Sequence, residues 1–117
     1  MQQYSWETVK KEVLNEHVWR KVVNGERITL AQIGIAKGGV VPTHHHENEQ
    51  ISLIIKGSLK FEMEGKEIIV HGGDVLHIPS NVPHRVTALE DTLAMDVFSP
   101  VRSDWMTGTD SYFRNKT

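Results

Sequence analysis

The chain has 117 residues, with 13 lysines and arginines against 15 aspartates and glutamates and a formal net charge of −2. A composition of 38% hydrophobic and 24% charged residues is typical of a globular protein and argues against disorder. The slightly acidic balance argues against a nucleic-acid partner, and the absence of cysteine excludes disulfides, thiolate zinc sites and a cysteine nucleophile.

The length and the lack of repeats or linkers predict one domain over residues 1–117. We expect an N-terminal arm (1–17), a barrel (about 18–99) and a C-terminal tail (100–117). No apolar stretch is long enough to span a bilayer, and the first residues lack a secretory signal. We therefore expect a cytoplasmic protein with no membrane partner.

The N-terminal segment Ser5–Asn15 predicts a short helix with Ser5 as its N-cap, although an extended arm fits nearly as well. From Val18 onward the pattern indicates strands. Asn24-Gly25 predicts a two-residue hairpin between strands at 18–23 and 27–36.

Recurring glycine, proline and asparagine turn signals divide the rest of the chain into short segments typical of strands. The predicted strands are 50–55, 58–63, 66–71, 74–78, 84–90 and 92–99. Short strands at this spacing predict an all-β antiparallel sandwich or barrel.

The last predicted strand has apolar residues on both faces. One face carries Leu93, Met95 and Val97, and the other carries Ala94, Asp96 and Phe98. In a small protein such a strand is covered by a second sheet or a second subunit, so we expect a homodimer that buries the first face. In the tail, Trp105, Tyr112 and Phe113 are expected to pack onto the barrel.

Histidines form the unusual feature of this sequence, with seven in all. His44-His45-His46 follow Pro42-Thr43, where we expect a strand to begin, so His44, His46 and Gln50 would share one face. His84 begins another predicted strand. Three imidazoles and one amide oxygen would suit one divalent transition metal ion (Zn, Ni, Fe or Mn). Alternatively, the triple histidine is an exposed loop and His84 is structural.

The glycine and proline framework around these histidines resembles the two cupin motifs. The first motif reads Gly38, His44, His46, Gln50, Gly57, and the second reads Gly73, Pro79, Asn81, His84. The resemblance covers about Arg20 to Phe98. It implies a cupin antiparallel β-barrel (jelly roll) of six to eight strands with a metal inside. Asn81 replaces a glycine of the second motif, and asparagine also tolerates left-handed backbone angles.

Gln50 stands where cupins usually have a glutamate, so all four ligands would be neutral. The metal would keep its full charge and act as a stronger Lewis acid, and oxygen-activating chemistry becomes less favourable. We interpret Glu47 and Glu49 as solvated charges.

Asp96 and Phe98 share the predicted inward face of the last strand, and Arg102 follows closely. A buried carboxylate is costly unless it is paired or functional. Asp96 and Arg102 are therefore either a structural ion pair or a proton-transfer group and a substrate-carboxylate clamp. His77 lies two residues after Val75 in a predicted strand, so the two side chains point to the same face, and we expect His77 to face the interior as a further substrate contact. Phe98 would line the pocket.

Three arginines outside this segment carry no such signal. We interpret Arg20, Arg27 and Arg85 as solvated charges.

The segment from Asp96 to Asp104, together with Asn81-Val82-Pro83-His84, is similar to the KdgF-type cupins. These proteins open the rings of 4,5-unsaturated uronates from pectin-type or alginate-type polysaccharides to give keto-uronates. The resemblance implies a carboxylated sugar substrate, metal binding by the residues named above, and catalysis by Asp96 and Arg102. A metal-dependent dioxygenase and a non-catalytic cupin that binds a carboxylate or sugar are the alternatives.

Overall fold

The computed structural model describes residues 1–108. Within this range the chain forms ten strands and one short helix. The elements are β1 (Lys11–Val13), β2 (Val18–Asn24), β3 (Thr29–Ile35), β4 (Val40–His44), β5 (Glu49–Lys56), β6 (Ser58–Met63), β7 (Lys66–His71), β8 (Val75–Ile78), β9 (His84–Ala88), β10 (Thr92–Ser99) and α1 (Ser103–Thr107). No helix in the described range is long and apolar enough to cross a membrane.

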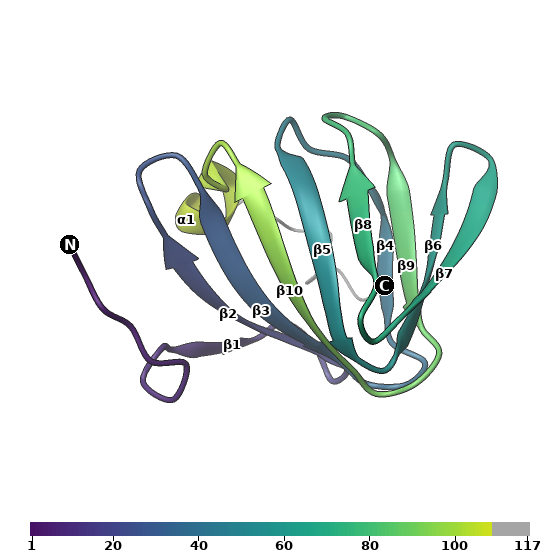
Figure 1. The fold of residues 1–117 in the computed structure, drawn as a ribbon, viewed down its shortest axis with the longest axis horizontal. Coiled ribbons are helices and arrows are strands. Elements are labelled where there is room, and N and C mark those ends of the chain that lie inside the picture. The colour runs from purple at the N-terminus through teal and green to yellow at the C-terminus, as the bar shows by residue number, and fades with distance from the viewer. Residues whose placement is uncertain (109–117) are drawn as a thin grey trace.

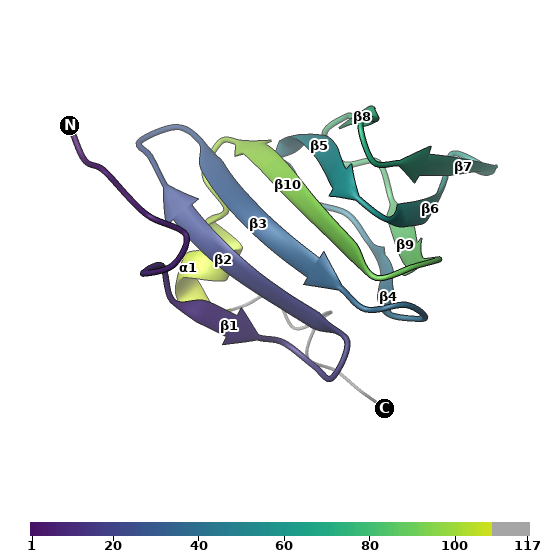
Figure 2. The same cartoon turned by 60° about the horizontal axis from the view of Figure 1, so that its bottom comes forward.

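The strands form two antiparallel sheets, one in the order β1-β2-β3-β10-β5-β8 and the other in the order β4-β9-β6-β7. The sheets enclose one core, and α1 lies against β2 and β3 at one end of it (Figures 1 and 2). This is the predicted all-β cupin barrel.

Side-chain alternation builds the core. In β6, Leu59, Phe61 and Met63 are buried while Lys60 and Glu62 are more exposed, because successive side chains of a strand point to opposite faces. The same alternation in β10 buries the side chains of residues 92, 94, 96 and 98. The prediction that Asp96 and Phe98 point inward is therefore confirmed.

The predicted N-terminal helix is wrong. Ser5 starts only a single turn, in which its carbonyl accepts hydrogen bonds from the amides of Thr8 and Val9. Beyond that turn, Lys11–Val13 pairs with β2, with Glu12 opposite Arg20. Pairing with β2 thus overrides a weak helical pattern, and the alternative of an extended arm is the better description.

The predicted strands from 50 to 99 agree with the observed ones to within two residues at each end. The hairpin between β2 and β3 is also confirmed, but its loop is longer than predicted. Asn24 still pairs with Thr29, and the loop closes through a hydrogen bond from the Gly25 amide to the Ile28 carbonyl. At Asn81 the left-handed conformation that the cupin motif requires is present, with φ 63°.

Candidate metal centre

Three histidines from separate segments meet inside the barrel. His44 is the last residue of β4 and lies opposite His84, the first residue of β9, while His46 lies in the loop before β5. Their ring centroids are 4.4–5.7 Å apart. One ring nitrogen from each lies within 4.8 Å of the others. The predicted convergence is confirmed, but strand parity was the wrong reason, because β4 ends at His44.

Each of these imidazoles is oriented by a backbone carbonyl two residues away. The Nδ1 atoms of His44, His46 and His84 lie 2.7, 3.0 and 2.8 Å from the carbonyl oxygens of residues 42, 48 and 82. A carbonyl can only accept, so each Nδ1 carries the proton and each Nε2 carries the lone pair. Metal-binding histidines are typically held in this way.

Burial keeps these imidazoles neutral. Desolvation, with repulsion from neighbouring histidines and Arg102, lowers the pKa of His44 to about 3 and that of His46 to about 4. Desolvation also lowers the pKa of His84. At neutral pH the cluster therefore offers lone pairs, which is the state that binds a metal cation.

Gln50, in β5, completes the arrangement. Its Oε1 lies 3.1 Å from Nε2 of His46, and its Nε2 donates a hydrogen bond of 2.9 Å to the hydroxyl of Ser52. Because His46 carries its proton on Nδ1, two acceptor atoms face each other at the short distance. Such a contact is unfavourable unless a cation lies between them. Three imidazole nitrogens and one amide oxygen thus fit a divalent transition metal.

Asp96, in β10, lies on the same inner wall. It is the register partner of Ser52, whose buried side chain lies on the same inner face of the neighbouring strand. Burial raises the pKa of Asp96 to about 6, although the Ser52 hydrogen bond and the charge of Arg102 oppose this rise. A carboxyl group with such a pKa can both accept and return a proton near neutral pH.

Arg102 is buried just after β10, but its ion pair is with Asp104 and not with Asp96. Its Nε and Nη2 donate to the two Asp104 carboxylate oxygens at 2.9 and 2.7 Å. The guanidinium also lies 4.7 Å from the ring centroid of Phe98 and 4.2 Å from that of Trp105. The structural alternative of an Asp96–Arg102 pair is therefore wrong.

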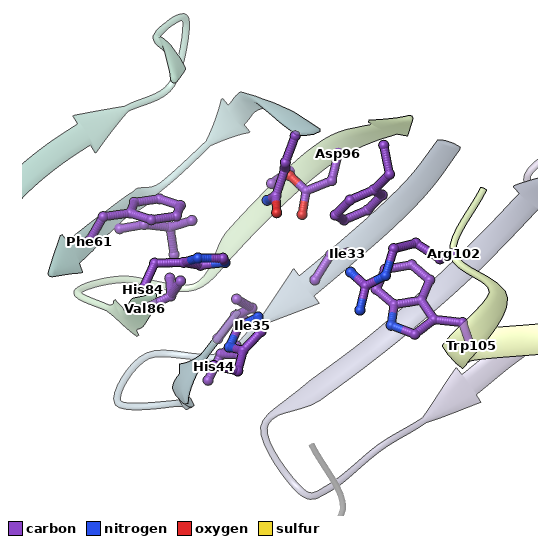
Figure 3. Close-up of a pocket in the computed structure, with 14 residues that line it drawn as sticks. Ile33, Ile35, His44, Phe61, His84, Val86, Asp96, Arg102 and Trp105 are labelled. Atoms are coloured by element: carbon purple, nitrogen blue, oxygen red, sulfur yellow. The ribbon is translucent and has the colours of Figure 1, made fainter. Parts of the chain in front are cut away.

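One cavity joins the two groups of residues. It is lined by His44, Gln50, His84, Asp96, Phe98 and Arg102, together with apolar side chains. Figure 3 shows His44 and His84 side by side, Asp96 reaching in from β10, and Arg102 with Trp105 farther along β3. The volume of about 40 Å³ has room for a metal ion and a few water molecules.

His77 does not belong to this site, so its predicted inward orientation is wrong. It is exposed on the outer face of β8, where its Nε2 lies 2.7 Å from a carboxylate oxygen of Glu49. In β8 the inward positions are those of Leu76 and Ile78, the opposite parity to the predicted one. Glu47 and Glu49 are exposed, as predicted.

Several residues around the site were not predicted. Asn48 is buried, and its backbone carbonyl accepts a hydrogen bond from Nδ1 of His46. Its side chain donates hydrogen bonds to the carbonyls of Pro100 and Val101, the two residues before Arg102. The interpretation of Arg20 as a solvated charge is wrong. Its side chain is fully buried, pairs with Glu12 and stacks on Trp105.

Trp105 is buried, as predicted, whereas Tyr112 and Phe113 lie outside the described residues. Asn48 and Arg20 carry no motif and gain their positions only through long-range pairing.

Comparisons with known proteins agree with this geometry. A family model described as the cupin domain matches residues 31–99. The pectin degradation protein KdgF of Dickeya dadantii (strain 3937) is 30% identical over 98 residues, which cover 81% of this chain and 89% of that protein.

Two solved structures resemble the fold closely. KdgF from Halomonas sp. has 27% identity and a TM-score of 0.79, and the match covers 85% of this chain and 94% of that one. An RmlC-like cupin from Shewanella frigidimarina has 22% identity and a TM-score of 0.82 over 90% of this chain and 96% of that one, a likeness of fold alone. The chain therefore belongs to the cupin family and is a relative of the KdgF proteins.

Proposed function

We propose that this protein is a metal-dependent enzyme that opens the ring of 4,5-unsaturated uronates to give linear keto-uronates. The observation that carries the proposal is one cavity whose lining includes two residues of the histidine cluster, His44 and His84, together with Asp96 and Arg102. The relationship to a protein named for pectin degradation supports the substrate class.

In this proposal, His44, His46, His84 and Gln50 hold one divalent metal ion. When bound, that ion supplies a Lewis acid that attracts the oxygen atoms of the substrate. All four protein ligands are neutral, so they leave the charge of the ion undiminished. This favours oxygen-atom binding over the stabilisation of a higher oxidation state, which a dioxygenase would need.

Arg102 would bind the substrate carboxylate. Asp104 holds its Nε and Nη2, and the rings of Phe98 and Trp105 flank the guanidinium, so it is oriented before a substrate arrives. Phe98 would form the apolar wall of the sugar site. Because a uronate ring is larger than the cavity, the sugar would bind partly outside it.

Asp96 would move the proton. Ring opening is an isomerisation in which a proton leaves the hydroxyl on the carbon that carries the ring oxygen, and a carbonyl forms there as the bond to the ring oxygen breaks. The ring oxygen leaves as an enolate, and the proton is then added to carbon to form the ketone. One group that accepts and returns a proton is sufficient. Its burial, which brings the pKa of Asp96 to about 6, suits this task.

The test is the ultraviolet absorbance of an unsaturated uronate mixed with metal-loaded protein. Loss of the conjugated double bond at a rate proportional to protein concentration is the expected result. Unchanged absorbance with metal bound would contradict the proposal. Oxygen uptake would then favour a dioxygenase, and tight uronate binding without turnover would favour a binding module.

We further propose that the chain forms a homodimer through the outer face of the larger sheet. Val97 lies between Ile51 and Leu30 in register, and this face is apolar and partly exposed. Sedimentation at micromolar concentration should show a dimer that Ile51→Glu converts to a monomer. Ile69→Glu, a change of another exposed isoleucine, on β7 in the other sheet, should leave the dimer intact.

A further inference from the structure

Ser52 connects two groups that the proposed reaction uses separately. Its side chain is 1% exposed on the inner face of β5, two residues after Gln50 and opposite Asp96 in β10. Its hydroxyl accepts a hydrogen bond of 2.9 Å from Nε2 of Gln50, so its own proton is left to turn toward the Asp96 carboxylate on the paired strand, where it lowers the pKa of Asp96. Asp96, Ser52 and Gln50 therefore form one polar row on the inner wall.

The direction of hydrogen bonding in this row determines what Gln50 presents to the histidines. The two ends of an amide have nearly the same shape, but only the oxygen can bind a metal, because the NH₂ group has no lone pair to offer. If the Gln50 amide were reversed, its NH₂ would donate to Nε2 of His46 and its oxygen would accept from Ser52. That arrangement would satisfy His46 without a metal and would abolish the site.

Asp96 prevents this reversal. A carboxylate can only accept, so it takes the proton of the Ser52 hydroxyl, and the Ser52 oxygen is left as an acceptor. The acceptor must face the NH₂ end of Gln50, which turns Oε1 toward His46, where it lies 3.1 Å from Nε2. The glutamate usual in cupins has two equivalent oxygens and needs no such control.

We infer that Ser52 is a positioning residue that, held by Asp96, fixes the Gln50 amide with its oxygen toward the metal. The inference rests on the metal centre proposed above. It assigns to Asp96 a second task, the orientation of a ligand, in addition to proton transfer.

The test is a double-mutant cycle on metal affinity, measured by competition between metal-free protein and a chromophoric chelator for Zn²⁺ at pH 8. Ser52→Ala should weaken zinc binding about ten- to a hundredfold, the usual effect of losing a partner that orients a ligand. In a Gln50→Glu background the same change should weaken binding less than about threefold, because either carboxylate oxygen can face the metal.

Ser58→Ala serves as the matched control. Ser58 is also buried and donates through its hydroxyl to Glu90, away from the site, so its loss should leave zinc affinity unchanged. Equal losses for Ser52→Ala in both backgrounds, or no loss in either, would overturn the inference and leave the metal centre standing. A wild-type protein that binds no zinc would overturn the metal centre itself and the inference with it.

A measurement on the wild type requires no change at Ser52. In ¹⁵N-labelled metal-free protein, the Gln50 side-chain NH₂ signal is the one that Gln50→Glu removes. Its protons should show a nuclear Overhauser effect to the side chain of Ser52 and not to the ring of His46. An effect to the His46 ring instead would overturn the inference even if Ser52→Ala did not fold.

Discussion

The two halves of the candidate site treat charge in opposite ways. On the histidine side, formed by His44, His46 and His84, the protein lowers the pKa of each ring and directs every Nδ1 proton to a backbone carbonyl. On the charged side, formed by Asp96, Arg102 and Asp104, it buries ions and holds them with specific partners.

This difference shows how one small barrel can attract two kinds of ligand. The converging Nε2 atoms of neutral histidines carry lone pairs and no protons. They favour a cation, because no proton has to be displaced when it binds. A buried guanidinium favours an anion with planar oxygen acceptors, such as a carboxylate. The cavity between them suits a molecule that brings oxygen atoms to one side and a carboxylate to the other.

The largest expected effect is on the histidine side. His84→Ala should remove most of the bound metal, since the loss of one of four ligands disables the site. Elemental analysis of the purified protein measures this directly. His71→Ala, a change at an exposed histidine in β7, is the control and should retain about one metal per chain. Full metal retention by His84→Ala would contradict the assignment.

On the charged side, Asp96→Asn should reduce turnover about a hundredfold or more, because an amide cannot accept and return a proton. Metal should still bind, since the asparagine oxygen can accept from Ser52, but with a lower affinity, because an amide does not fix the direction of that hydroxyl as a carboxylate does. The uronate absorbance assay and elemental analysis give both values. An equally active variant would keep the reaction but remove Asp96 from it.

Arg102→Lys should have a smaller effect, roughly a tenfold rise in KM, because an ammonium cannot reproduce the two-pronged hydrogen bonding of a guanidinium. Arg85→Lys is the control, since Arg85 is half exposed and pairs with Glu62 on the other sheet. If KM and kcat of Arg102→Lys match the wild type, while thermal stability falls, then Arg102 is structural.

The two sides also differ in how far the sequence predicted them. His44, His46, Gln50 and His84 stand in a fixed pattern with glycines and prolines, so a motif indicates all four of the proposed metal ligands. The inward orientation of Asp96 was predicted from the alternation of side chains along a strand, and this alternation holds throughout the regular strand β10.

The partners of the charged side could not be predicted in this way. Arg102 pairs with Asp104 because the chain turns into α1 after β10, and Arg20 is buried because Trp105 from that helix packs over it. For His77, alternation gave the wrong face because the phase of the short strand β8 is set by its pairing with β5. Such contacts depend on where distant segments meet, and no local pattern specifies them.

The smallest expected effect is on the stability of the metal-free protein in acid. The folded-state pKa of His44 is lowered to about 3 and that of His46 to about 4. As pH falls below about 6.5, the unfolded chain therefore takes up protons on these two histidines before the folded protein does, and the free energy of unfolding decreases. Protonation of Asp96 changes the free energy of unfolding in the opposite direction. Its folded-state pKa is raised to about 6, so between about pH 6 and 4 the folded protein takes up a proton that the unfolded chain does not, and this stabilises the fold.

Comparing the wild type with Asp96→Asn isolates the Asp96 contribution, because every other titrating group is shared by the two proteins. The free energy of unfolding of both should fall on acidification. As pH falls from about 6 to 4, the free energy of unfolding of the wild type should rise relative to that of the variant by about 1.4 kcal/mol for each pH unit. Denaturant unfolding of metal-free protein at pH 7, 6, 5 and 4 measures this difference. A constant difference across that range would show that Asp96 does not take up a proton there. The loss of stability in acid would then come from other groups, such as the histidines.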